Sequence, residues 1–292
     1  MLAIAKVFVK LGRGREDLMA KLLKTLKKSL LSFLHHEIPE VEYVVLKHVE
    51  YLVGTMKTDV FNNNFKQFFI GGNEKSYIKS TKIKILRLLA SDFNFADIVN
   101  EFAEYLFDED ISEEASTGLA QLLSKAAEGD AKFIAKTVVK TIETAPLPSI
   151  CNNALPLAAH FLRLYPKEFA LFANVFYLLV ESAKEEDSRC ALLEIVGDFG
   201  EMIEEAPQLL DIPGVLSDQL KISQLRATTK IFLKRPQEMA ETLSSLLKKT
   251  LSDDETHLHI KDYASYIYRG LEAGVESFKS GFLERRPHSR AV

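Results

Sequence analysis

Residues 189–210, with the sequence RCALLEIVGDFGEMIEEAPQLL, contain the clearest structural pattern in the chain. Apolar residues recur at helical spacing on one side and acidic residues on the other: Leu192, Ile195, Val196, Phe199 and Ile203 against Glu194, Asp198, Glu201, Glu204 and Glu205. The pattern predicts a helix with one buried face, and Pro207 with the apolar run after it predicts that a second helix begins almost at once. Because such a helix cannot bury its apolar stripe alone, we expect neighbours of the same kind.

The composition favours helices over strands. The chain has 292 residues, of which 47% are hydrophobic, and this is enough for an extensive core in two ordinary domains or in one elongated array. The 13 Gly and 9 Pro residues are too few for a strand-rich sandwich, and the runs between them are long. We therefore expect an all-α chain.

Charge is unevenly distributed along the chain. The net charge of −4 gives no general affinity for nucleic acid. Basic residues nevertheless gather near the start, where they meet only two acidic ones: Lys6, Lys10, Arg13, Arg15, Lys21, Lys24, Lys27 and Lys28. This cluster fits either a solvated face of the first helices or a patch for an anionic membrane or nucleic acid. Aromatic residues are nearly absent from it, so we expect no nucleic-acid partner.

The two cysteines and the absence of long apolar runs bear on the cellular compartment. Cys151 and Cys190 lie in apolar helical runs without partners at metal-ligand spacing, which is typical of core residues in a reducing environment. No apolar run reaches the ~18 residues that a membrane span requires, and the start has no signal-peptide pattern. We expect a cytoplasmic protein that associates with membranes only through other proteins.

Long one-sided helices recur at a nearly constant interval. They are predicted to begin near residues 40, 76, 113, 149, 188, 220 and 260. Further helical segments are predicted between them, at residues 60–70, 94–107, 132–144, 166–179 and 238–251. An interval of about 32–40 residues is the period of a repeated helix pair in HEAT-like and armadillo-like arrays. The alternative is an irregular all-α domain.

The predicted fold class is thus all-α, a HEAT/armadillo-like α-solenoid, that is, a superhelix of antiparallel helix pairs. We expect one continuous array over residues 1–275, without an internal domain boundary, and a polar, disordered tail over residues 276–292.

No residue pattern predicts catalysis, a cofactor or a metal site. The nearest approach to a metal site is Asp253, Asp254, His257 and His259 in one polar turn, which a solvated loop between two helices explains better. His35-His36-Glu37 lacks a second histidine one turn later, and Gly12-Arg13-Gly14 lacks the preceding strand and the following Lys-Ser/Thr pair of a phosphate-binding loop. We assign no catalytic, cofactor-binding or metal-binding residue.

Several stretches together resemble the trunk of the β-type large chains of adaptor complexes, the β-adaptins of clathrin and related vesicle coats. In the family's order they are Glu42–Val49 (EYVVLKHV), Phe68–Ile70, Tyr77–Lys79, Leu88–Ala90, Ile195–Glu201 (IVGDFGE), Lys230–Pro236 (KIFLKRP), Asp262 and Tyr266–Tyr268. The match spans about Ala5 to Leu271. Glu194 and Arg269 stand where the family usually places tryptophan, so a divergent member is implied.

The resemblance implies a structural scaffold subunit of a heterotetrameric adaptor complex in vesicle-mediated intracellular protein transport, without enzyme activity or cofactors. The implied partners are the N-terminal domain of a medium chain, a second large chain and a small chain, with clathrin or a related coat reached indirectly. The implied location is the cytoplasm, peripherally on coated vesicles, Golgi, endosomal or plasma membranes. The match begins within the family's trunk and lacks its hinge and appendage, so we expect a fragment or a short form. The alternative is a HEAT-like scaffold of another class, a nuclear transport receptor or an assembly platform.

Overall fold

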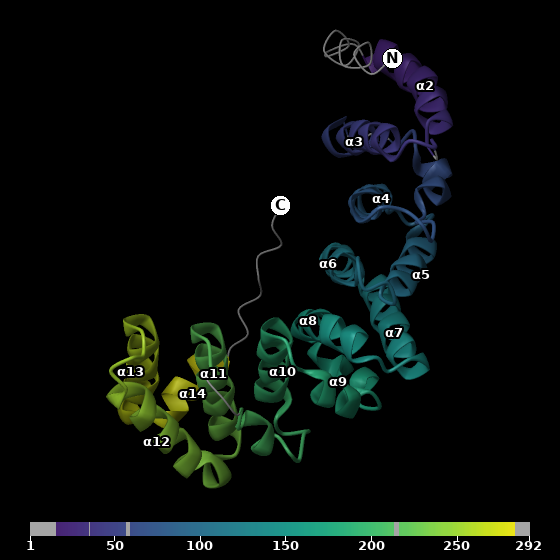
Figure 1. The fold of residues 1–292 in the computed structure, drawn as a ribbon. Coiled ribbons are helices and arrows are strands. Elements are labelled where there is room, and N and C mark those ends of the chain that lie inside the picture. The colour runs from purple at the N-terminus through teal and green to yellow at the C-terminus, as the bar shows by residue number, and fades with distance from the viewer. Residues whose placement is uncertain (1–15, 35, 57–58, 213–215, 284–292) are drawn as a thin grey trace. The chain divides into compact units, whose positions relative to one another are not determined.

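The computed structural model describes residues 16–34, 36–56, 59–212 and 216–283, which form helices joined by turns and short irregular segments (Figure 1). Among these described residues there is no β-strand. The chain divides into two compact units, residues 1–157 and 158–292. The division falls inside one helix, one residue after Pro156, whose missing N–H removes one hydrogen bond from that helix. Whether residues 1–275 form one continuous array stays a prediction.

The first unit contains two layers of helices. Its elements are α2 (Glu16–Ser32), α3 (Pro39–Met56), the 3-10 helix η1 (Asn62–Phe68), α4 (Ser76–Leu89), α5 (Phe95–Tyr105), α6 (Ser112–Leu123), α7 (Glu128–Thr144) and the first part of α8 (Pro148–Leu164). Helices α3, α4 and α6 lie side by side, and α5 and α7 lie in the other layer (Figure 1). The expected inner face of α4 is confirmed, because Ile78, Ile85, Leu86 and Leu89 are all buried.

The second unit repeats this arrangement. It contains the rest of α8, the 3-10 helix η2 (Pro166–Phe172), α9 (Phe176–Ser182), α10 (Glu186–Phe199), the 3-10 helix η3 (Gln208–Leu210), α11 (Asp218–Lys234), α12 (Pro236–Ser252), α13 (Leu258–Ala273) and α14 (Val275–Leu283). Helices α10, α11 and α13 form a row, and α12 packs against both α11 and α13 (Figure 1). We call α3, α4, α6, α10, α11 and α13 the row helices.

The spacing expected from the sequence is confirmed by the row helices. The helices predicted to begin near residues 40, 76 and 113 are α3, α4 and α6, and those predicted near 188, 220 and 260 are α10, α11 and α13. The helix expected near 149 is α8. The repeated unit is therefore one row helix with its partner in the other layer, and the fold is all-α and HEAT/armadillo-like.

Two glycines explain why the helices of the second unit approach so closely. A Cβ atom on Gly197 would lie 3.0 Å from the Cα of Ala227, and one on Gly200 would lie 2.9 Å from Cγ1 of Ile231. Any larger side chain at these two positions of α10 would push α11 away. The Gly-Asp-Phe-Gly sequence is thus a packing motif between α10 and α11.

Three expectations about secondary structure are corrected. The one-sided helix predicted to carry its apolar stripe through Ile203 ends at Phe199, because the chain turns at Gly200 and buries Ile203 from outside the helix. Only the short η3 stands where a second helix was expected after Pro207. Pro166 opens the 3-10 helix η2, and the α-helix α9 follows only at Phe176.

The polar tail expected at residues 276–292 is also wrong in its first part, since Val275–Leu283 is helix α14. Its Phe278 and Phe282 pack against the core of α11, α12 and α13, and this burial makes the segment helical despite its polar residues. Residues 284–292 lie outside the described part of the chain.

Candidate partner-binding face

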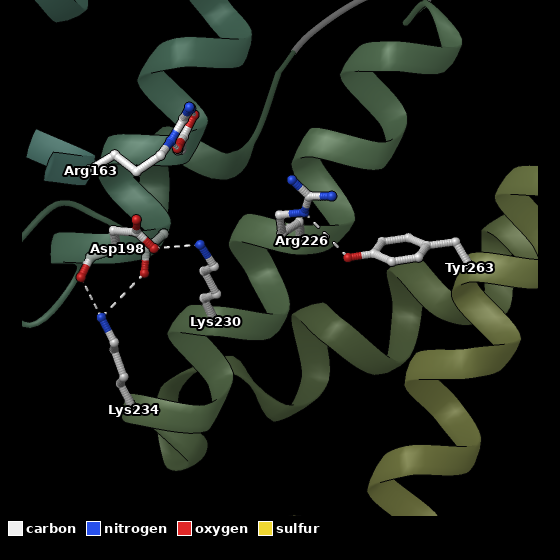
Figure 2. Close-up of polar contacts among 8 residues, drawn as sticks. Arg163, Asp198, Arg226, Lys230, Lys234 and Tyr263 are labelled. Atoms are coloured by element: carbon white, nitrogen blue, oxygen red, sulfur yellow. Dashed lines mark hydrogen bonds and ion pairs between the residues drawn. The ribbon is translucent and has the colours of Figure 1, made fainter. Parts of the chain in front are cut away.

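Polar side chains tie neighbouring helices of the second unit together at intervals of one repeat. Arg163 on α8 donates two hydrogen bonds to the Glu194 carboxylate on α10, from Nε to Oε1 at 2.8 Å and from Nη2 to Oε2 at 2.7 Å. Lys230 on α11 pairs with Asp198 on α10, and Arg226 on α11 donates from Nε to the Tyr263 hydroxyl on α13 at 3.4 Å. We call this set the polar ladder (Figure 2).

The ladder also reaches backbone carbonyls at the end of α10. Lys234 donates from Nζ to the carbonyl oxygens of Gly197 and Asp198 (Figure 2). The Arg235 guanidinium donates to the carbonyl oxygens of Glu201 and Ile203 at 3.3 and 3.2 Å. Gly197 and Asp198 belong to the last turn of α10, where helix carbonyls lack an intrahelical donor, whereas Glu201 and Ile203 belong to the turn that follows it. The side chains of α11 therefore satisfy the end of α10.

The charge pairs of the polar ladder set the alignment of neighbouring helices more than they stabilise the fold. The Glu194 carboxylate raises the pKa of the Arg163 guanidinium above its ordinary value, as expected for a two-pronged ion pair. The Arg163 and Glu194 side chains are 37% and 29% exposed, so solvent screens the pair, and such pairs contribute only about 0.2–1 kcal/mol. Each contact of the polar ladder can form only when the two facing helices are correctly aligned.

An open groove lies next to the ladder on α13. It is lined by Asp262, Ser265, Tyr266, Arg269 and Gly270 and has a volume of about 460 Å³. The Tyr266 side chain is 57% exposed. A site that binds small molecules usually encloses most of its ligand. This groove is instead shallow and lined by both polar and apolar groups, which is typical of a surface that binds another protein.

Two of the residues that the sequence analysis considered for metal binding make structural hydrogen bonds. Asp253 accepts a hydrogen bond from the Thr256 hydroxyl at 2.7 Å and another from the Glu255 N–H at 3.0 Å, which fixes the turn before α13. His36 accepts from the Ile38 N–H at 3.1 Å. Burial raises the pKa of the Cys190 thiol, which makes it a poorer nucleophile. His35 and Gly12-Arg13-Gly14 lie outside the described residues.

Sequence reasoning missed the ladder itself. The signal that could have found it is the separation of its partners, which is 31 positions for Arg163 and Glu194 and 37 for Arg226 and Tyr263. Complementary polar side chains one repeat apart come together when the helices stack. In the sequence these residues look like ordinary surface residues, so the spacing alone did not single them out.

The repeated helix pairs and the ladder between them define an α-helical repeat protein of the HEAT/armadillo-like class. More particularly, the chain belongs to the adaptin N-terminal region family, whose model matches residues 1–273. The resemblance to β-type adaptor chains that the sequence motifs indicated is confirmed by this match and by the relatives.

The similar proteins are large chains with β in their names. The chain is 27% identical over 277 residues to AP-1 complex subunit beta-1 of Mus musculus, covering 93% of this chain and 29% of that protein. It is 26% identical over 281 residues to Beta-adaptin-like protein A of Arabidopsis thaliana, and the match covers 94% of this chain and 33% of that protein. It is 26% identical over 261 residues to AP-2 complex subunit beta of Saccharomyces cerevisiae, and the match covers 86% of this chain and 36% of that protein. The chain thus spans about a third of the length of these curated relatives.

The helices of the described part also bear on membrane insertion. None of them combines the length and the apolar character needed to cross a membrane. The basic cluster expected near the start lies only partly within the described residues. There, Lys21, Lys24 and Lys28 are exposed on α2.

Proposed function

We propose that this chain is a scaffold in a β-type large subunit of a heterotetrameric adaptor complex, acting in vesicle-mediated intracellular protein transport. The observation that carries the proposal is the match of the adaptin N-terminal region to residues 1–273, with relatives named as AP-1 and AP-2 complex β subunits. In this role the chain has no enzymatic activity. It works in the cytoplasm, peripherally at coated-vesicle, Golgi, endosomal or plasma membranes.

The mechanism follows from how stacked helix pairs present their surfaces. Within each unit, a row helix adds its exposed side to that of its neighbour, and in the second unit the polar ladder fixes the register of the helices. Such a frame holds other subunits at fixed positions: the N-terminal domain of a medium chain, a second large chain and a small chain. Clathrin or a related coat is then reached through the assembled complex.

The exposed side of α10, α11 and α13 is the surface we assign to the medium chain. It combines exposed Tyr266 with the exposed charges of Arg226 and Arg269 beside the open groove. Aromatic and arginine side chains are enriched in protein interfaces, and a permanent subunit contact buries on the order of 2,000 Å² or more. An interface of this size depends mainly on apolar burial, so we expect it to survive moderate salt.

Co-expression with the N-terminal domain of a medium adaptor chain tests this function. We expect the two proteins to elute together in size-exclusion chromatography at physiological salt and at about 0.5 M salt, where exposed ion pairs are largely screened. Separate elution, with both proteins folded by circular dichroism, would show that the proposal is wrong.

A matched pair of charge reversals tests the assigned surface. Arg226→Glu changes an exposed residue of α11 in the ladder, and Lys248→Glu makes the same change on exposed α12 in the other layer. We expect Arg226→Glu to weaken the association more than tenfold and Lys248→Glu to leave it unchanged. If the two variants bind equally well, the medium chain uses a different surface.

A further inference from the structure

Three metal-ligating side chains meet where α11 and α13 begin. Asp218 is the first residue of α11, His257 directly precedes α13, and His259 is the second residue of α13. One ligand atom from each lies within 4.8 Å of the other two. His257 Nε2 is 3.4 Å from Asp218 Oδ2, and the two imidazole rings have centroids 5.8 Å apart. In the sequence, His257 and His259 group with Asp253 and Asp254 instead, because Asp218 comes from the previous repeat.

The backbone on both sides of this cluster is fixed. The Ser217 hydroxyl accepts a hydrogen bond from the Leu220 N–H at 3.3 Å and so caps α11 next to Asp218. The His257 carbonyl accepts from the Ile260 N–H at 3.0 Å, which closes the first turn of α13. Beneath them, Leu225 and Ile260 belong to one buried core. The donors are therefore held on two packed helices, and only side-chain rotation is needed to close them on an ion.

We propose that Asp218, His257 and His259 form a zinc-type site that joins two consecutive row helices. Two imidazole nitrogens and one carboxylate oxygen are a donor set for Zn²⁺, whereas Mg²⁺ and Ca²⁺ prefer oxygen ligands alone. His257 and His259 are exposed, which leaves the fourth coordination position to water.

The local charge permits a cation at this position. The first turns of α11 and α13 carry partial positive charge, which opposes a cation. Lys221 and Lys261, which act on Asp253 in the same turn, also oppose it. Asp218 itself and the acidic residues Asp253, Asp254 and Glu255 supply more negative charge than these two lysines offset. A bound ion would replace the weak His257–Asp218 contact by bonds to both helices. The site thus adds a metal-dependent rung to a ladder that is otherwise built from charge pairs and hydrogen bonds.

Titration of the full chain with ZnCl₂ in a calorimeter tests the proposal, with thermal unfolding as a second measurement. We expect one Zn²⁺ per chain and a higher melting temperature in its presence, because the ion binds only the folded site. The double variant His257→Gln with His259→Gln should bind Zn²⁺ more than about tenfold more weakly and lose the rise in melting temperature. MgCl₂ and CaCl₂ should give neither effect.

The control is Asp254→Asn, which changes a carboxylate of the same turn outside the three donors and should bind Zn²⁺ like the wild type. The proposal is overturned if the double variant binds Zn²⁺ as tightly as the wild type while both are folded by circular dichroism. It is equally overturned if the wild type takes up no Zn²⁺, or if Ca²⁺ raises the melting temperature as much, because the cluster would then be only a set of surface charges.

Discussion

Phe199, near the end of α10, stacks on Phe169 with ring centroids 4.7 Å apart and an interplanar angle of 14°. Its side chain is 6% exposed, whereas Glu201, two residues later, is exposed. Truncation of a buried aromatic ring removes both its transfer free energy and its packing contacts. Phe199→Ala should therefore lower the free energy of unfolding by about 3–5 kcal/mol, and Glu201→Ala should change it by less than about 0.5 kcal/mol.

Urea denaturation of both variants checks this prediction. Equal shifts of the two midpoints would mean that the buried face of α10 is assigned incorrectly.

Asp108, in the turn after α5, has a charge state that depends on a partner. Lys79 Nζ donates to its Oδ2 at 2.5 Å, and this bond lowers the pKa of the Asp108 carboxyl below its ordinary value of 3.8. Because the folded pKa is the lower one, the stabilisation is complete above the ordinary value and is lost as the pH falls through the folded value.

We expect Asp108→Asn to be less stable than the wild type at neutral pH, and the difference to narrow as the pH is lowered from about 4. Urea denaturation at a series of pH values measures it. Asp92→Asn, in the exposed turn before α5, is the control. Its free energy of unfolding should change with pH in the same way as that of the wild type. If the difference in free energy of unfolding between Asp108→Asn and the wild type stayed constant down to pH 3, the Lys79–Asp108 bond would not be the cause of the lowered pKa.

At the scale of elements, a buried ion cluster joins α3, α4 and the loop between them. Lys82 on α4 is fully buried, and its Nζ lies 2.6 Å from Glu74 Oε1 and 3.1 Å from Glu42 Oε1. Removal of one partner from such a cluster leaves buried charge without compensation, whereas replacement of all partners by uncharged groups can be nearly neutral. The cluster therefore specifies how α3 and α4 align more than it stabilises them.

Lys82→Met should accordingly destabilise the fold by about 3–5 kcal/mol. The triple variant, with Glu42→Gln and Glu74→Gln added, should recover a large part of this loss. Denaturant unfolding of both variants measures the two free energies of unfolding that this prediction compares. A triple variant that is less stable than Lys82→Met would show that the three charges do not act as a unit.

At the scale of the whole molecule, a repeat protein is held together by contacts between successive repeats, so a local defect should weaken with distance along the chain. Lys82→Met provides the defect in the first unit. We expect faster amide hydrogen exchange in α3 and α4 and nearly unchanged exchange in α11, α12 and α13. Mass spectrometry of peptic fragments measures this, and uniform acceleration over all these helices would indicate a single cooperative unit instead.

The amino-acid sequence determined the fold class and the repeat. Apolar residues at helical spacing are a local property, so the row helices could be placed within a few residues of where they begin. Helix ends were predicted less well where packing overrides the local pattern. The backbone turns at Gly200, yet Ile203 remains buried, and the period alone therefore extended α10 too far. Helix α14 was missed because Phe278 and Phe282 become apolar anchors only against neighbouring helices.

The candidate surfaces were decided only by tertiary structure. Arg163 and Glu194 are unremarkable charges until α8 and α10 bring them within 2.7 Å. Asp218 and His259 are 41 positions apart in the chain, and only the packing of α11 against α13 places them together. The sequence defines which face of each helix is buried, because burial follows from a pattern along one segment. Which side chains of different repeats meet depends on how far each helix is rotated and shifted against the next, and close contacts such as that of Gly197 with Ala227 set this only in the folded chain.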